Sequence, residues 1–240
     1  MNSQSGNSMR SMPVNIGHAV PAGTLGRGGV KRPAWVSAGV HQRVVLVLDA
    51  SPSMAGEKAR EASDAALAFV RELAEPVNKG GFDVAVIQFA GRAKVTENFR
   101  PASDLASRMG KIEVRGFRTN IAKALALAEE VMEGARTEDG EVRQIRPAVF
   151  LMTDGAHNGW SNPDVVAERV KAKADVITVA FGMDADEVAL RRWATSPQHF
   201  YRVTDGRELR NLLAAAGATL TKTMAAGGSA TRALAGLRRQ

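Results

Sequence analysis

The sequence contains no cysteine, which excludes disulfide bridges and thiolate metal sites. Aromatic residues make up only 5% of the 240 residues, so we expect a core built from Val, Leu, Ile and Ala. No stretch is long and apolar enough to span a bilayer. The polar residues 1–10 are not followed by the apolar segment of a secretory signal. These absences favour a protein of a reducing cytoplasm with no membrane association.

The formal charge of +7 is confined to the two ends of the chain. Residues 1–40 contain four basic and no acidic side chains, and residues 224–240 contain three basic and no acidic ones. Because these charges are spread out rather than clustered, we do not expect nucleic-acid binding. The composition predicts a flexible basic N-terminal tail over 1–40, one domain over 41–223 and a flexible basic C-terminal tail over 224–240.

Strand-like and helix-like segments alternate along the predicted domain. Continuous apolar runs at 44–48 and 148–152 are typical of strands buried on both faces. Residues 56–77 and 121–132 each have the apolar stripe of a helix. The alternation predicts an α/β fold, a doubly wound and mostly parallel central sheet with helices on both faces. Residues 93–99 follow a tight turn, and we expect them to form one antiparallel edge strand.

Oxygen-bearing side chains stand at three places where predicted elements begin or end. Asp49 and Asp154 each end a buried strand, and Ser51 and Ser53 follow in the loop after the first of these strands. Thr119 directly precedes a helix. Because ligands of parallel sheets collect beyond the carboxyl ends of the strands, we expect these side chains to share one crevice.

This set of side chains indicates a divalent cation site. Two adjacent carboxylates repel each other unless a cation neutralises them. Carboxylate and hydroxyl oxygens are the hard ligands that Mg²⁺ and Ca²⁺ prefer, and a compact, hydroxyl-rich set favours Mg²⁺, with Mn²⁺ or Ca²⁺ as alternatives. Three hydroxyls and two carboxylates, bound directly or through water, leave at least one position of an octahedron open. A Glu or Asp of a protein partner could fill that position.

Three parts of the sequence occur in a fixed order: Asp-x-Ser-x-Ser after an apolar strand, a threonine before a helix, and Asp-Gly after a later strand. Together they resemble the metal-ion-dependent adhesion site (MIDAS) of von Willebrand factor A (VWA) domains. The resemblance covers about residues 43–223 and implies a Rossmann-like VWA fold and metal-dependent protein binding. The metal ligands it implies are the hydroxyls of Ser51, Ser53 and Thr119, with Asp49 and Asp154 binding directly or through water.

Among VWA domains, the chain looks most like the small cytoplasmic bacterial ones. These include the tellurite-resistance-associated type, which is often linked to a kinase and a phosphatase, and the partners of MoxR-type ATPases. The resemblance therefore implies a role in a bacterial stress-response or signalling complex.

Two residues depart from the usual pattern, and three mark the expected rim of the site. Pro52 stands where glycine is common and stiffens the loop. Arg118 stands before the threonine where a small residue is more usual. We expect Arg118, His157 and Trp160 to form a partner-binding rim, with His157 not a metal ligand. Trp160 is either an exposed anchor for a partner or a side chain that packs over the sheet end.

Each part of the pattern also has a purely structural explanation. The two serines could cap a helix starting near Gly56, Thr119 could be only an N-cap, and Asp154-Gly155 only a turn. We expect no enzyme. A metal-dependent phosphoester hydrolase is the catalytic alternative, but the haloacid-dehalogenase type needs a second aspartate where this chain has Ser51, and no nucleophile elbow is present. A scaffold whose metal only stabilises the fold is the remaining alternative.

Overall fold

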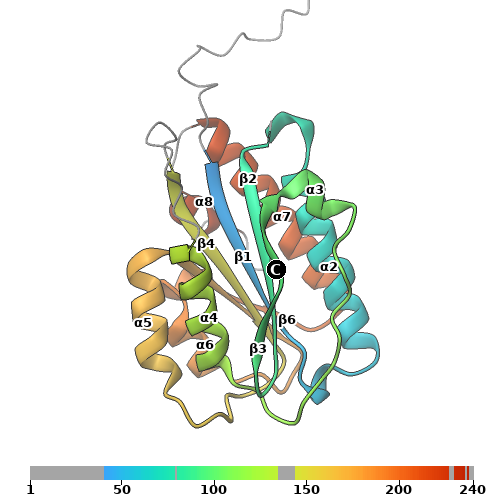
Figure 1. Ribbon diagram of the computed structural model, residues 1–240, viewed down its shortest axis with the longest axis vertical. Coiled ribbons are helices and arrows are strands. Elements are labelled where there is room, and N and C mark those ends of the chain that lie inside the picture. The colour runs from blue at the N-terminus through green and yellow to red at the C-terminus, as the bar shows by residue number, and fades with distance from the viewer. Residues whose placement is uncertain (1–40, 79, 135–143, 227–229, 236, 238–240) are drawn as a thin grey trace, which may run out of the picture. The chain divides into compact units, whose positions relative to one another are not determined.

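The structure, a computed structural model, describes residues 41–78, 80–134, 144–226, 230–235 and 237; the predicted N-terminal tail lies outside these ranges. A six-stranded sheet runs through the described part (Figure 1). Its strands are β1 (His41–Asp49), β2 (Phe82–Phe89), β3 (Ala93–Pro101), β4 (Gln144–Thr153), β5 (Asp175–Phe181) and β6 (Phe200–Val203). Their order is β3-β2-β1-β4-β5-β6, and only the β2–β3 pair is antiparallel. The predicted fold class, including the antiparallel edge strand, is confirmed.

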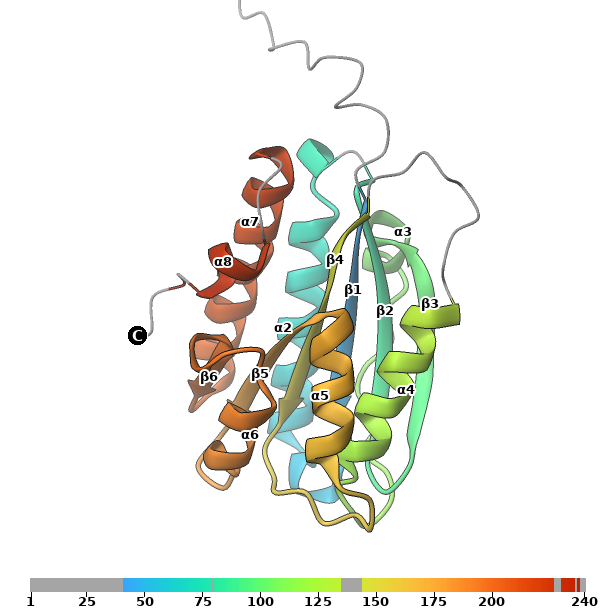
Figure 2. The same ribbon diagram turned by 90° about the vertical axis from the view of Figure 1, so that its left-hand side faces the viewer.

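Helices cover both faces of the sheet (Figure 2). One face carries α2 (Glu57–Leu73), α3 (Ala102–Ala106), α7 (Gly206–Ala226) and α8 (Ala230–Ala235). The other carries α4 (Ile121–Gly134), α5 (Pro163–Lys173) and α6 (Glu187–Trp193). Short 3-10 turns lie at Pro52–Met54, Pro76–Asn78 and Pro197–His199. No helix in the described ranges is both long enough and apolar enough to cross a membrane.

The core consists of two apolar layers, one on each side of the sheet. Successive side chains of β1 alternate between them: Val44 and Leu46 join the layer under α2 and α7, whereas Val45 joins the layer under α4 and α5. Phe69 of α2 packs on Phe150 of β4 with ring centroids 4.9 Å apart. The apolar run in β1 is therefore explained by burial on both faces.

The two halves of the fold diverge from the central strands β1 and β4, which are parallel neighbours. The connection from β1 to β2 runs through α2 on one face, and that from β4 to β5 runs through α5 on the other. Chain connections leaving in opposite directions create a crevice beyond the carboxyl ends of the two strands. Asp49 ends β1 and Asp154 directly follows β4, so both lie at this crevice.

Two predicted boundaries differ from the structure. The helix expected over 56–77 ends at Leu73, because the Asn78 side chain turns back and donates hydrogen bonds to the carbonyls of Glu72 and Leu73 at 3.2 and 3.0 Å. Where a flexible tail was expected from residue 224, α7 continues to Ala226 and α8 follows. Leu234 of α8 is fully buried in the core, which gives this segment an apolar anchor.

Candidate metal centre

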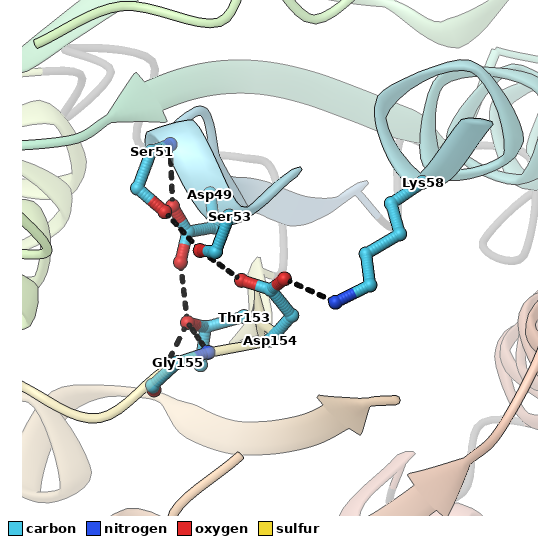
Figure 3. Close-up of polar contacts among 7 residues, drawn as sticks. All are labelled: Asp49, Ser51, Ser53, Lys58, Thr153, Asp154 and Gly155. Atoms are coloured by element: carbon cyan, nitrogen blue, oxygen red, sulfur yellow. Dashed lines mark hydrogen bonds and ion pairs between the residues drawn. The ribbon is translucent and has the colours of Figure 1, made fainter. Parts of the chain in front are cut away.

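Asp49 is fully buried at the end of β1. Its Oδ1 accepts a hydrogen bond from the Ser51 N–H at 2.8 Å, and its Oδ2 accepts one from the hydroxyl of Thr153, the last residue of β4 (Figure 3). Burial raises the pKa of Asp49, the hydrogen bonds from Thr153 and Ser51 oppose that effect, and the nearby charge of Asp154 adds to it. Asp49 is thus a carboxylate whose negative charge a cation would stabilise.

Ser51 directly precedes the 3-10 turn that follows β1, and Ser53 lies on that turn. Their Oγ atoms are 3.0 Å apart, and the Ser53 hydroxyl donates to Asp154 Oδ1 at 2.7 Å. Ser51 is buried, Ser53 is exposed, and Met54, fully buried beneath the turn, anchors it to the core. Neither serine caps the following helix, because α2 begins after Gly56 and Ser51 makes no side-chain cap hydrogen bond. Both hydroxyls are directed instead toward the crevice.

Thr119 reaches the same crevice from the loop before α4. The neighbouring Asn120 caps the first turn of α4, because its Oδ1 accepts from the Lys123 N–H at 3.1 Å. A Cβ atom added to Gly155 would lie 3.7 Å from Thr119 Oγ1 and 3.9 Å from Ser53 Oγ. The two hydroxyls therefore converge on one side of Gly155.

Asp154, also fully buried, is held by two donors. Besides Ser53 on Oδ1, the ammonium of Lys58 lies 2.7 Å from Oδ2 (Figure 3). Lys58 belongs to the first turn of α2 and its side chain is 34% exposed, whereas the side chain of Asp154 is inaccessible. The site therefore already contains one positive charge supplied by the protein.

The three expected rim residues lie around this site in different roles. The ring of His157 joins its loop to the start of α4: Nδ1 accepts from the Ile121 N–H at 3.1 Å, and Nε2 lies 2.9 Å from the carbonyl oxygen of Ser161. The Arg118 guanidinium lies over the Trp160 ring, 5.4 Å from its centroid. Trp160 is 90% exposed, so of its two expected positions it takes the exposed one.

Sequence reasoning missed three residues that hold the candidate ligands in place. Thr153 orients Asp49, and Lys58 pairs with Asp154. Asn158 holds Thr119 through two hydrogen bonds: its side-chain Oδ1 accepts from the Thr119 N–H at 2.7 Å, and its backbone N–H donates to the Thr119 carbonyl at 3.0 Å. The only sequence signal for Thr153 and Asn158 is their closeness to Asp154 in the chain. Lys58 has no local signal, because its contact depends on the packing of α2 against the end of β4.

The donor set fits a hard divalent cation. The structure brings together two carboxylates and three hydroxyls at the carboxyl ends of β1 and β4. Among the described residues no group of three or more His, Asp or Glu side chains could hold a metal ion, so a metal at this site would depend on the hydroxyl oxygens. The residues that would hold it are Asp49, Ser51, Ser53, Thr119 and Asp154.

A groove of about 800 Å³ adjoins the site, between the β2–β3 edge and the loop that leads to Thr119. Ala50 and Arg118 line both the groove and the edge of the candidate metal centre. Its charged lining consists of Arg92, Lys94, Lys111, Arg115 and Arg118 against Glu97 and Glu113. The groove is therefore basic, and Phe117, 96% exposed, stands at its end next to Arg118.

The chain belongs to the von Willebrand factor type A domain family, whose sequence pattern it matches over residues 44–215. Domains of this family generally mediate metal-dependent protein–protein interactions. Inter-alpha-trypsin inhibitor heavy chain 4 of Mus musculus is 26% identical over 167 residues, which are 64% of this chain and 17% of that protein. The corresponding protein of Sus scrofa is 24% identical, again over 17% of its length. The chain thus spans about a sixth of the curated relatives it matches.

Solved structures share the fold at low identity. Proximal thread matrix protein 1 from the mussel byssus superposes with a TM-score of 0.61 at 24% identity, covering 78% of this chain and 49% of the other. A second structure of that protein, with a zinc-occupied MIDAS motif, gives 0.57 at 22% identity, covering 78% and 48%. A von Willebrand factor type A protein from Catenulispora acidiphila gives 0.62 at 16% identity, covering 76% and 43%.

Proposed function

We propose that this chain is a non-enzymatic protein-interaction module that binds an acidic residue of a partner through Mg²⁺ held at the candidate metal centre. The observation that carries the proposal is the convergence of the Ser51, Ser53 and Thr119 hydroxyls with two buried carboxylates. When bound, the metal supplies a positive centre for one carboxylate oxygen of the partner. The family's general mode of action supports the proposal.

The surroundings of the site support an acidic partner. The basic groove starts at the site and offers favourable electrostatics to a negatively charged segment. Trp160 and Phe117 are large, exposed apolar side chains of the kind that anchor protein interfaces. Arg118 lies over the Trp160 ring and lines the groove together with Phe117, where its guanidinium can pair with a carboxylate that does not reach the metal.

The contacts around the two carboxylates favour binding over a purely structural metal. Thr153 and Ser51 hold Asp49, and Ser53 and Lys58 hold Asp154, so both buried carboxylates have partners within the protein. The two apolar core layers consist of side chains from the strands and the covering helices, and their packing involves none of the five candidate ligands. We therefore expect the metal-free domain to stay folded, whereas a scaffold stabilised by its metal would unfold on chelation.

The test is calorimetric titration of the chelated and dialysed protein with Mg²⁺, followed by titration with a hexaglutamate peptide. We expect one Mg²⁺ per chain and peptide binding only in its presence, with hexaglutamine as the neutral control. Ser53→Ala, which removes an exposed hydroxyl of the site, should weaken Mg²⁺ binding by about tenfold. Ser107→Ala is the matched control, because Ser107 is an exposed serine whose hydroxyl donates to the carbonyl of Asp104. Equal Mg²⁺ affinity in the two variants would contradict the proposed ligand set.

The cellular setting is part of the same proposal. The absence of cysteine and the resemblance to small bacterial VWA domains support a cytoplasmic stress-response or signalling complex. Partners of the kinase, phosphatase or ATPase type are the candidates to screen, each for an acidic segment that binds in a Mg²⁺-dependent manner.

A further inference from the structure

Lys58 is positioned so that its charge acts on the candidate metal centre. It lies in the first turn of α2 and reaches across to Asp154 beyond the end of β4, as Figure 3 shows. A Cβ atom added to Gly182, directly after β5, would lie 3.6 Å from Lys58 Nζ and 3.7 Å from its Cε. The end of the lysine side chain therefore pairs with Asp154 and also lies close to Gly182.

The charges of the site explain what this lysine does. With both carboxylates ionised, Asp49, Asp154 and Lys58 sum to one negative charge. A divalent cation turns that into one positive charge, which a single carboxylate from a partner would neutralise. Without Lys58, the metal-loaded site would already be neutral and would attract an anion less strongly.

We propose that Lys58 is a built-in counter-ion that weakens the binding of a divalent metal to the free domain and strengthens the binding of one carboxylate ligand to the metal-loaded domain. The proposal rests on the proposed function, because it needs a metal at this site. Its consequence is coupling: the metal binds loosely alone and tightly together with an acidic partner. Lys58 would thereby favour complexes in which metal and partner are bound together.

The same contact makes an opposite role conceivable, in which Lys58 only holds Asp154 in place. The two roles differ in sign. A counter-ion opposes the metal, so removal of its charge tightens metal binding, whereas a residue that positions Asp154 helps the metal, so its removal loosens metal binding. The sign of the change therefore separates electrostatic opposition from simple positioning.

The test compares Lys58→Met, which keeps the length of the side chain without its charge, with Lys58→Arg, which keeps the charge. Lys222→Met on α7 is the matched control, since it removes the same charge from an exposed position. Mg²⁺ alone is titrated into each chelated protein by calorimetry, and hexaglutamate is then titrated into the Mg²⁺-saturated protein at the same ionic strength.

We expect Lys58→Met to bind Mg²⁺ about tenfold more tightly and hexaglutamate about tenfold more weakly, because one unit charge, on a side chain that solvent partly screens, acts on a divalent ion. Lys58→Arg and Lys222→Met should match the wild type in both titrations. Should Lys58→Met fail to fold without metal, Lys58→Gln replaces it, because its amide can still donate to Asp154.

Weaker or unchanged Mg²⁺ binding by the charge-free variant would overturn the counter-ion role while leaving the proposed function intact. If the wild-type protein binds no Mg²⁺, with or without hexaglutamate, the proposed function itself fails, and the role of Lys58 fails with it. The wild-type titration therefore distinguishes the two failures before any variant is compared.

Discussion

Asn158 offers a sharp test of how the candidate metal centre is held together. Its side-chain Oδ1 accepts a hydrogen bond from the N–H of Thr119 at 2.7 Å, and its backbone N–H donates to the Thr119 carbonyl at 3.0 Å. Asn158→Ala removes the first of these bonds and keeps the second. The backbone of Thr119, a residue 4% exposed, then loses one acceptor, which corresponds to about 1 kcal/mol of unfolding free energy.

The loss should also reach the metal, because Thr119 is one of the three hydroxyl ligands in the proposed set. Removal of a residue that orients a metal ligand typically weakens affinity by about 10-fold to 100-fold. Since the second hydrogen bond remains, we expect the lower end, about tenfold weaker Mg²⁺ binding. The assays are urea denaturation in chelator for stability and calorimetric titration for Mg²⁺.

Asn162→Ala is the matched control, an asparagine four residues further along the same loop. Its Oδ1 accepts the N–H of Asp164 at 2.9 Å and caps α5, so its loss should also lower stability by about 1 kcal/mol. This hydrogen bond is made to α5 and not to Thr119, so Mg²⁺ affinity should stay unchanged. If both variants bind Mg²⁺ equally well, the reasoning that Asn158 positions Thr119 is refuted.

Two further predictions concern stability. Hydrogen bonds from Arg169 hold the pKa of Glu129 below its usual value. The pair therefore stabilises the fold fully at pH values above the pKa of a glutamate in the unfolded chain. This stabilisation is lost as the pH falls through the lower pKa that Glu129 has in the folded state. Glu129→Gln should therefore lower the free energy of unfolding at pH 7, and urea denaturation should show the difference from wild type shrinking below about pH 4.3; an undiminished difference at lower pH would contradict this. Gly159→Ala would place a Cβ atom 2.5 Å from the buried Asn120 side chain that caps α4, and we expect a loss of about 1–2 kcal/mol in urea denaturation. Gly110→Ala, with open space around its added Cβ, is the control, and an equal loss there would point to a general effect of removing glycine.

Much of the fold could be predicted because it depends on local sequence patterns. The apolar run of β1 and the helical stripe of α4 each indicate an element and its burial without knowledge of the rest. The five candidate ligands could be found because a short signature at strand ends and a helix start is visible in the chain itself. The parallel pairing of β1 with β4 brings four of them together, Asp49, Ser51, Ser53 and Asp154, whereas Thr119 is brought to them by the loop before α4.

What the sequence could not show depends on contacts between distant segments. Lys58 and Asp154 are 96 residues apart, and Thr153 and Asp49 are 104 apart. Their pairing requires the register of two strands and the position of a helix, neither of which is coded locally. The end of α2 was missed for a different, local reason, because the Asn78 side chain donates to carbonyls five and six residues earlier.

The edges of the sheet limit where this protein can associate with others. β3 forms one edge, and its side chains include Lys94, Glu97 and Arg100, whose charges oppose the addition of another strand. β6 forms the other edge and is only four residues long, too short to template extended pairing. Both edges are thus poor starting points for aggregation through strand pairing.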